Sequence, residues 1–266
     1  MPDKKQALLI DECDGVARLT MNRSERLNAL NPGLATALRE YFQQLERRHD
    51  LRVVILQGAG RAFCAGLDLK EQPDGRALGV EGMYAVQHSI RDIMLAMRRC
   101  PQPIISVIQG AASGGGMTLA LASDIRLATP DARMNAAFIR IGLTGCDMGA
   151  SYFLPRMIGS SAAAEYLLTG RFIDAPRALG LGLYSQVDAL PVIQQEAEAL
   201  ARDMLRTNPL GLRLTKDGLT HAIDAGSLDA VLAMEDRQQV LCSQSAAFGE
   251  GMRAFLEKRE PRYDLS

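Results

Sequence analysis

The sequence predicts an α/β fold with largely parallel strands, followed by a region that is wholly helical. Two compact apolar runs, Val53–Leu56 and Ile104–Ile108, have the length and composition of buried strands, and each runs into a glycine-containing turn. Helical spacing lies between and after these runs, which is the alternation typical of a parallel sheet. From about Pro191 onward only helical spacing is left. We therefore expect an α/β core over residues 1–190 and a helical C-terminal region over 191–266.

The expected elements can be placed in order along the chain. Residues 7–21 alternate apolar and polar side chains around Asp14-Gly15, which is typical of a β-hairpin. Residues 72–82 are rich in Gly, Asp and Pro, so we expect a mobile surface loop there. Helical periodicity predicts helices over these ranges: 32–47, 84–98, 117–123, 191–206, 209–224, 227–243 and 246–258.

The composition argues against several classes of protein. The 266 residues are 47% hydrophobic and carry 30 basic against 31 acidic side chains, a net charge of −1. This balance indicates no basic face for nucleic acid, and polar residues interrupt every apolar stretch that could span a membrane. The five cysteines form no C-x-x-C pair, so neither a disulfide framework nor a metal site is expected. Since no signal-peptide pattern is present either, we expect a cytoplasmic protein.

Two glycine turns are the first candidates for chemistry. One contains Gly66, and the other is the run Gly114-Gly115-Gly116. Backbone N–H groups at such turns can hold negative charge, and glycine lets a ligand approach the backbone closely. Two N–H groups that converge would form an oxyanion hole, in which each donor is typically worth about 3–4 kcal/mol in the transition state. The alternative is that both are tight turns packed beneath helices.

Several motifs in a fixed order carry a resemblance to a known family. They are MNRSERLNAL (21–30), AFCAGLDLK (62–70), QGAASGGG (109–116) with ASD (122–124), LPRMIG (154–159), LTGR (168–171) and EGMRAFLEK (250–258). With these motifs the chain resembles the enoyl-CoA hydratase/isomerase (crotonase) superfamily over nearly its whole length. The resemblance implies a crotonase-like spiral of ββα units with a helical C-terminal trimerisation region. It also implies an acyl-CoA thioester as substrate without a further cofactor, and a homotrimer or a dimer of trimers.

The resemblance further implies which residues form the site. The oxyanion donors fall on the backbone N–H groups of Leu67 and Gly115. Phe255 and Lys258 match positions that reach the CoA of a neighbouring subunit. The other positions implied to bind the substrate are Arg26, Ala29, Ala65, Asp68, Leu69, Lys70, Thr118 and Phe138.

The sequence departs from the hydratases of this superfamily at two positions. In those enzymes two glutamates flank the water that adds across the double bond, and the matching residues here are Thr118 and Phe138. Neither side chain can supply a carboxylate base, so hydration by two glutamates is not expected. Phe138 would instead make the acyl pocket apolar, and Thr118 could at most orient a water or a polar acyl group.

One carboxylate is left near the expected pocket. Counting back from the LPR motif, Asp147 matches an aspartate of the dienoyl-CoA isomerases and the nucleophilic aspartate of the 4-chlorobenzoyl-CoA dehalogenases. Counting forward from Gly142 places Cys146 there instead. In an apolar pocket an aspartate has a raised pKa and can move a proton. The alternative is that Asp147 caps the N-terminus of a helix that begins near Gly149.

The favoured hypothesis is an enoyl-CoA hydratase or isomerase type of enzyme that acts through a thioester enolate. In it, Leu67 and Gly115 stabilise the oxyanion and Asp147 moves the proton. Two alternatives stay open. With Asp147 as a nucleophile the protein would be an acyl-CoA hydrolase or dehalogenase. The missing glutamates also fit a catalytically silent acyl-CoA binder, and the acyl group is not predicted from the sequence.

Overall fold

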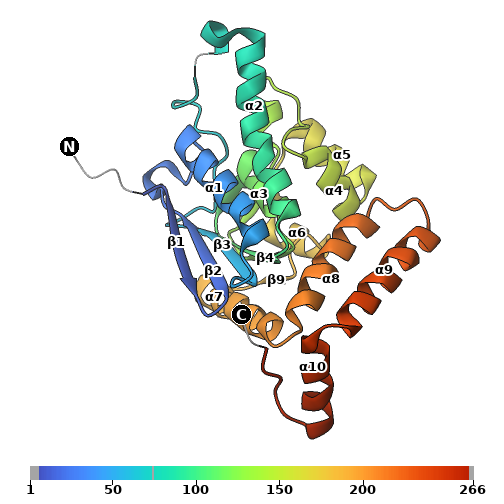
Figure 1. The fold of residues 1–266 in the computed structure, drawn as a ribbon. Coiled ribbons are helices and arrows are strands. Elements are labelled where there is room, and N and C mark those ends of the chain that lie inside the picture. Colours follow the sequence, from blue (N-terminus) through green and yellow to red (C-terminus); the bar gives the residue numbers. More distant parts are fainter. Residues whose placement is uncertain (1–5, 74, 264–266) are drawn as a thin grey trace.

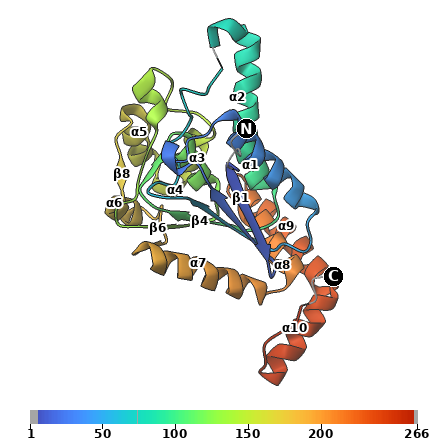
Figure 2. The same ribbon diagram turned by 90° about the vertical axis from the view of Figure 1, so that its left-hand side faces the viewer.

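A computed structural model describes residues 6–73 and 75–263 of the chain. Its centre is a sheet with helices on both faces, as Figures 1 and 2 show. In this sheet β1 pairs antiparallel with β2, and every later neighbour is parallel. The strands are, in spatial order, β1 (Leu8–Cys13), β2 (Val16–Met21), β3 (Val53–Gly58), β4 (Ile104–Ile108), β6 (Ile125–Ala128) and β9 (Gln186–Val187). The predicted α/β class, the hairpin and the two buried strands are confirmed.

A smaller sheet lies beside the second glycine turn. It contains β5 (Ala111–Ser113), β7 (Arg133–Asn135) and β8 (Ile173–Asp174), and β5 is parallel to β7. Each glycine turn thus lies beyond the carboxyl end of a buried parallel strand, the place where open α/β sheets bind ligands.

Helices cover both faces of the larger sheet, which explains why β3 and β4 are apolar almost without interruption. On one face Val54 and Leu56 pack in the same core as α1 (Pro32–Gln44), α2 (Gly75–Arg99) and α3 (Gly115–Ala122). On the other face Val53 and Ile55 pack with Ile193, Ala197 and Ala201 of α7 (Leu190–Leu205). Successive side chains of β3 point to opposite faces of the sheet because a strand has a two-residue period.

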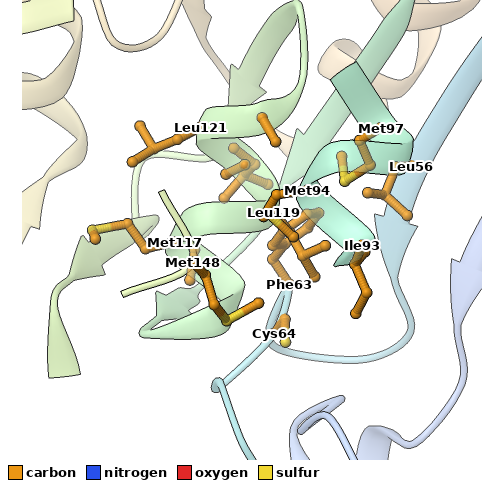
Figure 3. Close-up of a cluster of buried hydrophobic side chains, with 14 of the residues drawn as sticks. Leu56, Phe63, Cys64, Ile93, Met94, Met97, Met117, Leu119, Leu121 and Met148 are labelled. Carbon is orange, nitrogen blue, oxygen red and sulfur yellow. The ribbon is translucent and has the colours of Figure 1, made fainter. Parts of the chain in front are cut away.

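Methionine and leucine side chains form much of the core behind the second glycine turn. All eight residues of α3 are buried, as expected for a helix that is apolar all round. Figure 3 shows Leu119 of this helix next to Met94 of α2 and Phe63, and Met117 on the other side, towards Met148. This packing fixes the start of α3, which carries Gly115.

The remaining helices are predicted in part: the last three match predicted ranges, a helix start is expected near Gly149, and the helices over residues 160–169 and 175–180 are not predicted. These remaining helices are α4 (Ala150–Ile158), α5 (Ser160–Thr169), α6 (Ala175–Gly180), α8 (Pro209–Ala222), α9 (Leu228–Ser243) and α10 (Ala246–Glu257). The last three begin where the side chains of Asn208, Ser227 and Ser245 accept hydrogen bonds from backbone N–H groups of the first turn. Such N-caps explain why these starts were readable in the sequence.

The surface loop predicted over residues 72–82 is wrong for most of its length, because α2 begins at Gly75. The helix is interrupted at Gly79, where φ is 65° and ψ is −175°. Glycine adopts such a conformation without the penalty that other residues pay. The glycine therefore marks a break between two helical segments, where the composition suggested continuous loop.

The C-terminal helices differ in how they contact the core. Helix α7 packs beneath the larger sheet and α8 contacts the core through Leu212 and Lys216, whereas α9 and α10 extend away from it (Figures 1 and 2). Helix α9 buries none of its residues, and α10 buries only Ala254. The division of the chain at residues 190/191 stays a prediction.

Candidate active site

The Gly66 turn is held in place by backbone hydrogen bonds on both sides. Towards the N-terminus, the N–H of Leu30 donates to Gly66 O (2.7 Å), and the N–H of Asp68 donates to Leu30 O (3.0 Å). Towards β5, the N–H of Ser113 donates to Cys64 O (2.9 Å). Three segments that are distant in sequence therefore form one short ladder, and this ladder aligns the first turn with the second.

The two glycine turns touch each other directly. Gly66 has a φ of +93°, and a Cβ atom at this position would lie 2.6 Å from Ser113 O and 3.4 Å from the nitrogen of Gly115. Gly115 is the first residue of α3, so its N–H has no acceptor within the helix. In the described part of the chain, neither this N–H nor that of Leu67 donates to a protein atom. The structure thus brings the two predicted donors together with their hydrogens available.

Apolar side chains surround the second turn. A Cβ atom at Gly114 would lie 3.2 Å from Cε1 of Phe138, and one at Gly115 would lie 2.9 Å from Cδ1 of Leu30 and 3.3 Å from Sδ of Met148. All three of these side chains are buried. An apolar and water-poor surrounding strengthens the attraction between N–H donors and a developing oxyanion. The expected placement of Phe138 beside the site agrees with this geometry.

The hydroxyl of Thr118 is already occupied by the protein. Thr118 is fully buried, and its Oγ1 donates to Gly115 O at 2.9 Å with Met148 Sδ at 3.7 Å. A threonine inside a helix commonly bonds back to a carbonyl of the preceding turn in this way. Its role in orienting a water or an acyl group stays a prediction.

Asp147 is half-buried in the loop before α4, and its Oδ1 accepts two hydrogen bonds. One comes from the N–H of Met148 at 2.7 Å, and the other comes from Nε2 of Gln87 on α2. Burial raises the pKa of this carboxyl, although both donors oppose the increase. The N-cap of α4 is Gly149, so the expectation that Asp147 caps this helix is wrong.

Cys146, the residue favoured by the other count, lies differently. Its side chain is exposed, and its N–H donates to Thr144 Oγ1 at 3.2 Å. The next residue but one, Met148, packs against Gly115. Asp147 lies between the exposed Cys146 and the buried Met148, and its side chain is the one bonded to α2.

The carboxylate of Asp68 faces inward, away from solvent. It forms an ion pair with Arg23 (3.0 Å) and accepts a hydrogen bond from the N–H of Lys70 (3.2 Å). Burial acts to raise the pKa of Asp68, but the bonds from Arg23 and Lys70 N–H outweigh it and the pKa is lowered. Arg23 also donates hydrogen bonds to Glu71 and to Ala29 O, so it links the chain on either side of the first glycine turn. Arg23 was not among the predicted site residues, because its partners Asp68 and Glu71 lie 45 and 48 positions away in the sequence.

The other positions expected to contact CoA fall into two groups. Around the first turn, Arg26, Leu69 and Lys70 are exposed, Ala29 is buried and Ala65 is half-buried. Phe255 and Lys258 lie at the end of α10, which is remote from α3 in both views (Figures 1 and 2). Phe255 is 81% exposed. Within one chain these two residues do not join the site, and their contact with a neighbour's CoA stays a prediction.

A cavity of about 290 Å³ lies next to the turns, between α1 and α2. Its apolar wall includes Leu30, Ala35, Val86 and Ile90. Leu30 also approaches Gly115, so it separates this cavity from the oxyanion donors. The size is near the lower end of ligand pockets.

Among residues 6–73 and 75–263, no three His, Cys, Asp or Glu side chains come together in an arrangement that could hold a metal ion. No helix in this part of the chain has both the length and the apolar character needed to cross a membrane.

Comparison with known proteins now identifies the family. The sequence model of the enoyl-CoA hydratase/isomerase family matches residues 11–265. The chain belongs to this family. Like its other members, this enoyl-CoA hydratase/isomerase homologue is an acyl-CoA enzyme, and the predicted crotonase fold is confirmed by the solved structures that it matches.

Its relatives carry more than one activity in their names. The chain is 38% identical over 253 residues to "probable enoyl-CoA hydratase echA12" of Mycobacterium bovis, with 92% of this chain and 88% of the relative covered. It is 36% identical to the 1,2-epoxyphenylacetyl-CoA isomerase of Escherichia coli, with coverage of 94% and 95%. The crystal structure of an enoyl-CoA hydratase from Bacillus anthracis matches 98% of this chain and 100% of that chain with a TM-score of 0.92 and 32% identity.

Proposed function

We propose that this protein is an acyl-CoA isomerase that acts through a thioester enolate. The observation that carries the proposal is the half-buried carboxylate of Asp147 in the loop whose Met148 packs against Gly115. By the family resemblance, Thr118 and Phe138 stand where the hydratases have their glutamates, so no other carboxylate is expected to serve as the base. The N–H groups of Leu67 and Gly115 bind the thioester oxygen. Asp147 moves the proton.

The steps follow from the charges on these groups. The two N–H donors stabilise negative charge on the thioester oxygen, so the carbon next to the carbonyl and its vinylogous position become acidic. Ionised Asp147 takes a proton from one carbon, and the enolate is held by the donors. Asp147 then returns this proton to another carbon, so a double bond moves and no water is consumed. The raised pKa of Asp147 suits a group that must both accept and release a proton.

Two observations support isomerisation over hydration. The side chains of Phe138 and Met148 keep the surroundings of the donors apolar, which disfavours an activated water. A relative 36% identical to this chain is named for an isomerase reaction.

We further propose that the protein is a homotrimer or a dimer of trimers in the cytoplasm. In this assembly residues 191–266 form the oligomerisation region, and Phe255 and Lys258 reach the CoA of the neighbouring subunit. The exposed apolar side chains of α10, including Phe255 and Leu256, support a partner on this helix.

The test compares the protein with the Asp147→Asn variant on a β,γ-unsaturated acyl-CoA. Appearance of the conjugated enoyl thioester is followed by absorbance, and binding is followed by calorimetry. We expect the variant to bind equally well and to lose roughly 10²–10⁴-fold in kcat. Unchanged kcat in the variant would refute the assignment of Asp147.

The same samples separate the alternatives. An ester on Asp147 trapped by mass spectrometry would indicate the hydrolase or dehalogenase. Acyl-CoA binding without turnover on a broad panel would indicate a silent binder. Rapid hydration of crotonyl-CoA would indicate water addition without the usual glutamates.

A further inference from the structure

Asp147 is bonded in an asymmetric way. Both of its hydrogen bonds, from Gln87 Nε2 and from Met148 N–H, go to Oδ1. Within the described residues no donor reaches Oδ2. Gln87 lies on α2, 60 residues before Asp147 in the chain, so this contact joins two separate walls of the site.

We propose that Gln87 is a positioning residue for Asp147. Its amide and the N–H of Met148 fix Oδ1, and Oδ2 is thereby left as the oxygen that takes the proton from the acyl-CoA and returns it. This inference rests on the proposed isomerase function and names a residue that acts only through Asp147.

The backbone that follows Asp147 adopts an uncommon conformation. Met148 has a φ of +47°, and Gly149 follows with +89°. Residues other than glycine avoid this region, and such strained residues are found where the surrounding structure holds them for function. At this residue the N–H donates to Asp147 Oδ1, and the side chain packs against Gly115. One residue thus links the carboxylate to the oxyanion turn.

Gln87 also adjusts the charge of Asp147. Burial, the N–H of Met148 and the Gln87 amide set the pKa of this carboxyl, and no charged side chain of the described residues contributes. An N–H donor favours the ionised form, so loss of the Gln87 amide raises the pKa of Asp147 further. More of the enzyme is then protonated, and inactive as a base, at the same pH.

The test uses Gln87→Met, which keeps the length of the side chain and removes the donor. We expect KM for the acyl-CoA to stay within about twofold, kcat to fall roughly 10-fold, and the acidic limb of kcat/KM to move up by about 0.5–1 pH unit. Gln43→Met on α1 is the matched control, because Gln43 is exposed and lies on another helix. This control keeps the kcat and pH profile of the unmodified enzyme.

A double variant decides whether Gln87 acts through Asp147. If it does, Asp147→Asn with Gln87→Met is no slower than Asp147→Asn alone, because the two losses do not add. Additive losses, or an unchanged acidic limb in Gln87→Met, would overturn the positioning role. Full activity of Asp147→Asn would instead overturn the proposed function, so the two failures are distinguishable. Since Gln87 is exposed, unchanged thermal unfolding of the Gln87→Met variant is expected at acidic pH, where Asp147 carries its proton.

Discussion

The lack of a side chain at Gly66 allows the two turns of the active site to touch. An added Cβ would lie 2.6 Å from Ser113 O, and the positive φ would strain any other residue. We expect Gly66→Ala to lose at least 10²-fold in kcat/KM, the typical effect of losing one oxyanion donor. Thermal unfolding should report a cost of about 1–3 kcal/mol for the strained backbone.

A matched substitution on α6 separates these effects from the mere addition of a methyl group. Gly180 is the last residue of α6, and a Cβ atom there meets nothing within 4 Å. Gly180→Ala should therefore leave kcat/KM unchanged and be neutral or slightly stabilising. Equal losses in both variants would contradict the role given to Gly66.

Asp147 is expected to reduce stability while it serves catalysis. Its pKa is higher in the folded protein than the ordinary value, so the folded state binds more protons than the unfolded state between those two pKa values. Stability therefore falls as pH rises through this window. Asp147→Asn removes this penalty, and its melting temperature should exceed that of the unmodified protein at pH 8. The difference should shrink towards pH 4, as measured by calorimetry, and a difference that grows at low pH would contradict the assignment.

Individual site residues were predictable where a local pattern reports them. The glycine turns are visible in the sequence because close backbone contacts require glycine, and the family resemblance then implies Leu67 and Gly115 as the donors within them. Gln87 and Arg23 were not predictable, since their roles arise from contacts with residues 60 and 45 positions away. An exposed glutamine has no signature of its own.

Helix α8 is attached to the core by a buried lysine. Lys216 is 4% exposed, and its Nζ lies 3.0 Å from Asp124 Oδ2 and 2.7 Å from Gln102 O. Asp124 also pairs with Arg98. Removing the charge of Asp124 leaves the lysine buried without its anion, and breaking such pairs costs about 3–5 kcal/mol.

We therefore expect Asp124→Asn to destabilise the protein by about 3 kcal/mol. Lys216→Met should cost less, because Asp124 keeps Arg98 and the N–H of Ile104 as partners. Urea unfolding followed by circular dichroism measures both, since the chain has no tryptophan to report by fluorescence. A larger cost for Lys216→Met would contradict the view that the unpaired lysine is the expensive state.

Elements were predicted best where side-chain caps or uninterrupted periodicity define them. The helices from α7 to α10 lie within two residues of their expected limits. The start of α2 could not be placed, because residues 75–82 lack an apolar stripe and contain a break at Gly79. The Gly, Asp and Pro content of residues 72–82 predicts a loop, but from Gly75 onward the chain is helical on both sides of Gly79.

At the scale of the whole molecule, the oxyanion turns and the end of α10 lie far apart in one chain. If a neighbour's α10 completes the CoA site, Phe255→Ser should raise KM for acyl-CoA about 10-fold with little change in kcat. Leu9→Ser, at an exposed position of β1, is the control and should change neither. Analytical ultracentrifugation should detect three or six chains of 28.9 kDa. A monomer with unchanged KM in the Phe255 variant would refute the assembly.

The ladder that joins Leu30 to Gly66 and Cys64 to Ser113 has a consequence for folding. The donors align only after three segments, separated by tens of residues, have paired. Contacts of this kind form late, because the chain must close long loops before they are made. During refolding, secondary structure should thus return before turnover does, and the recovery of activity marks the arrival of the complete native topology.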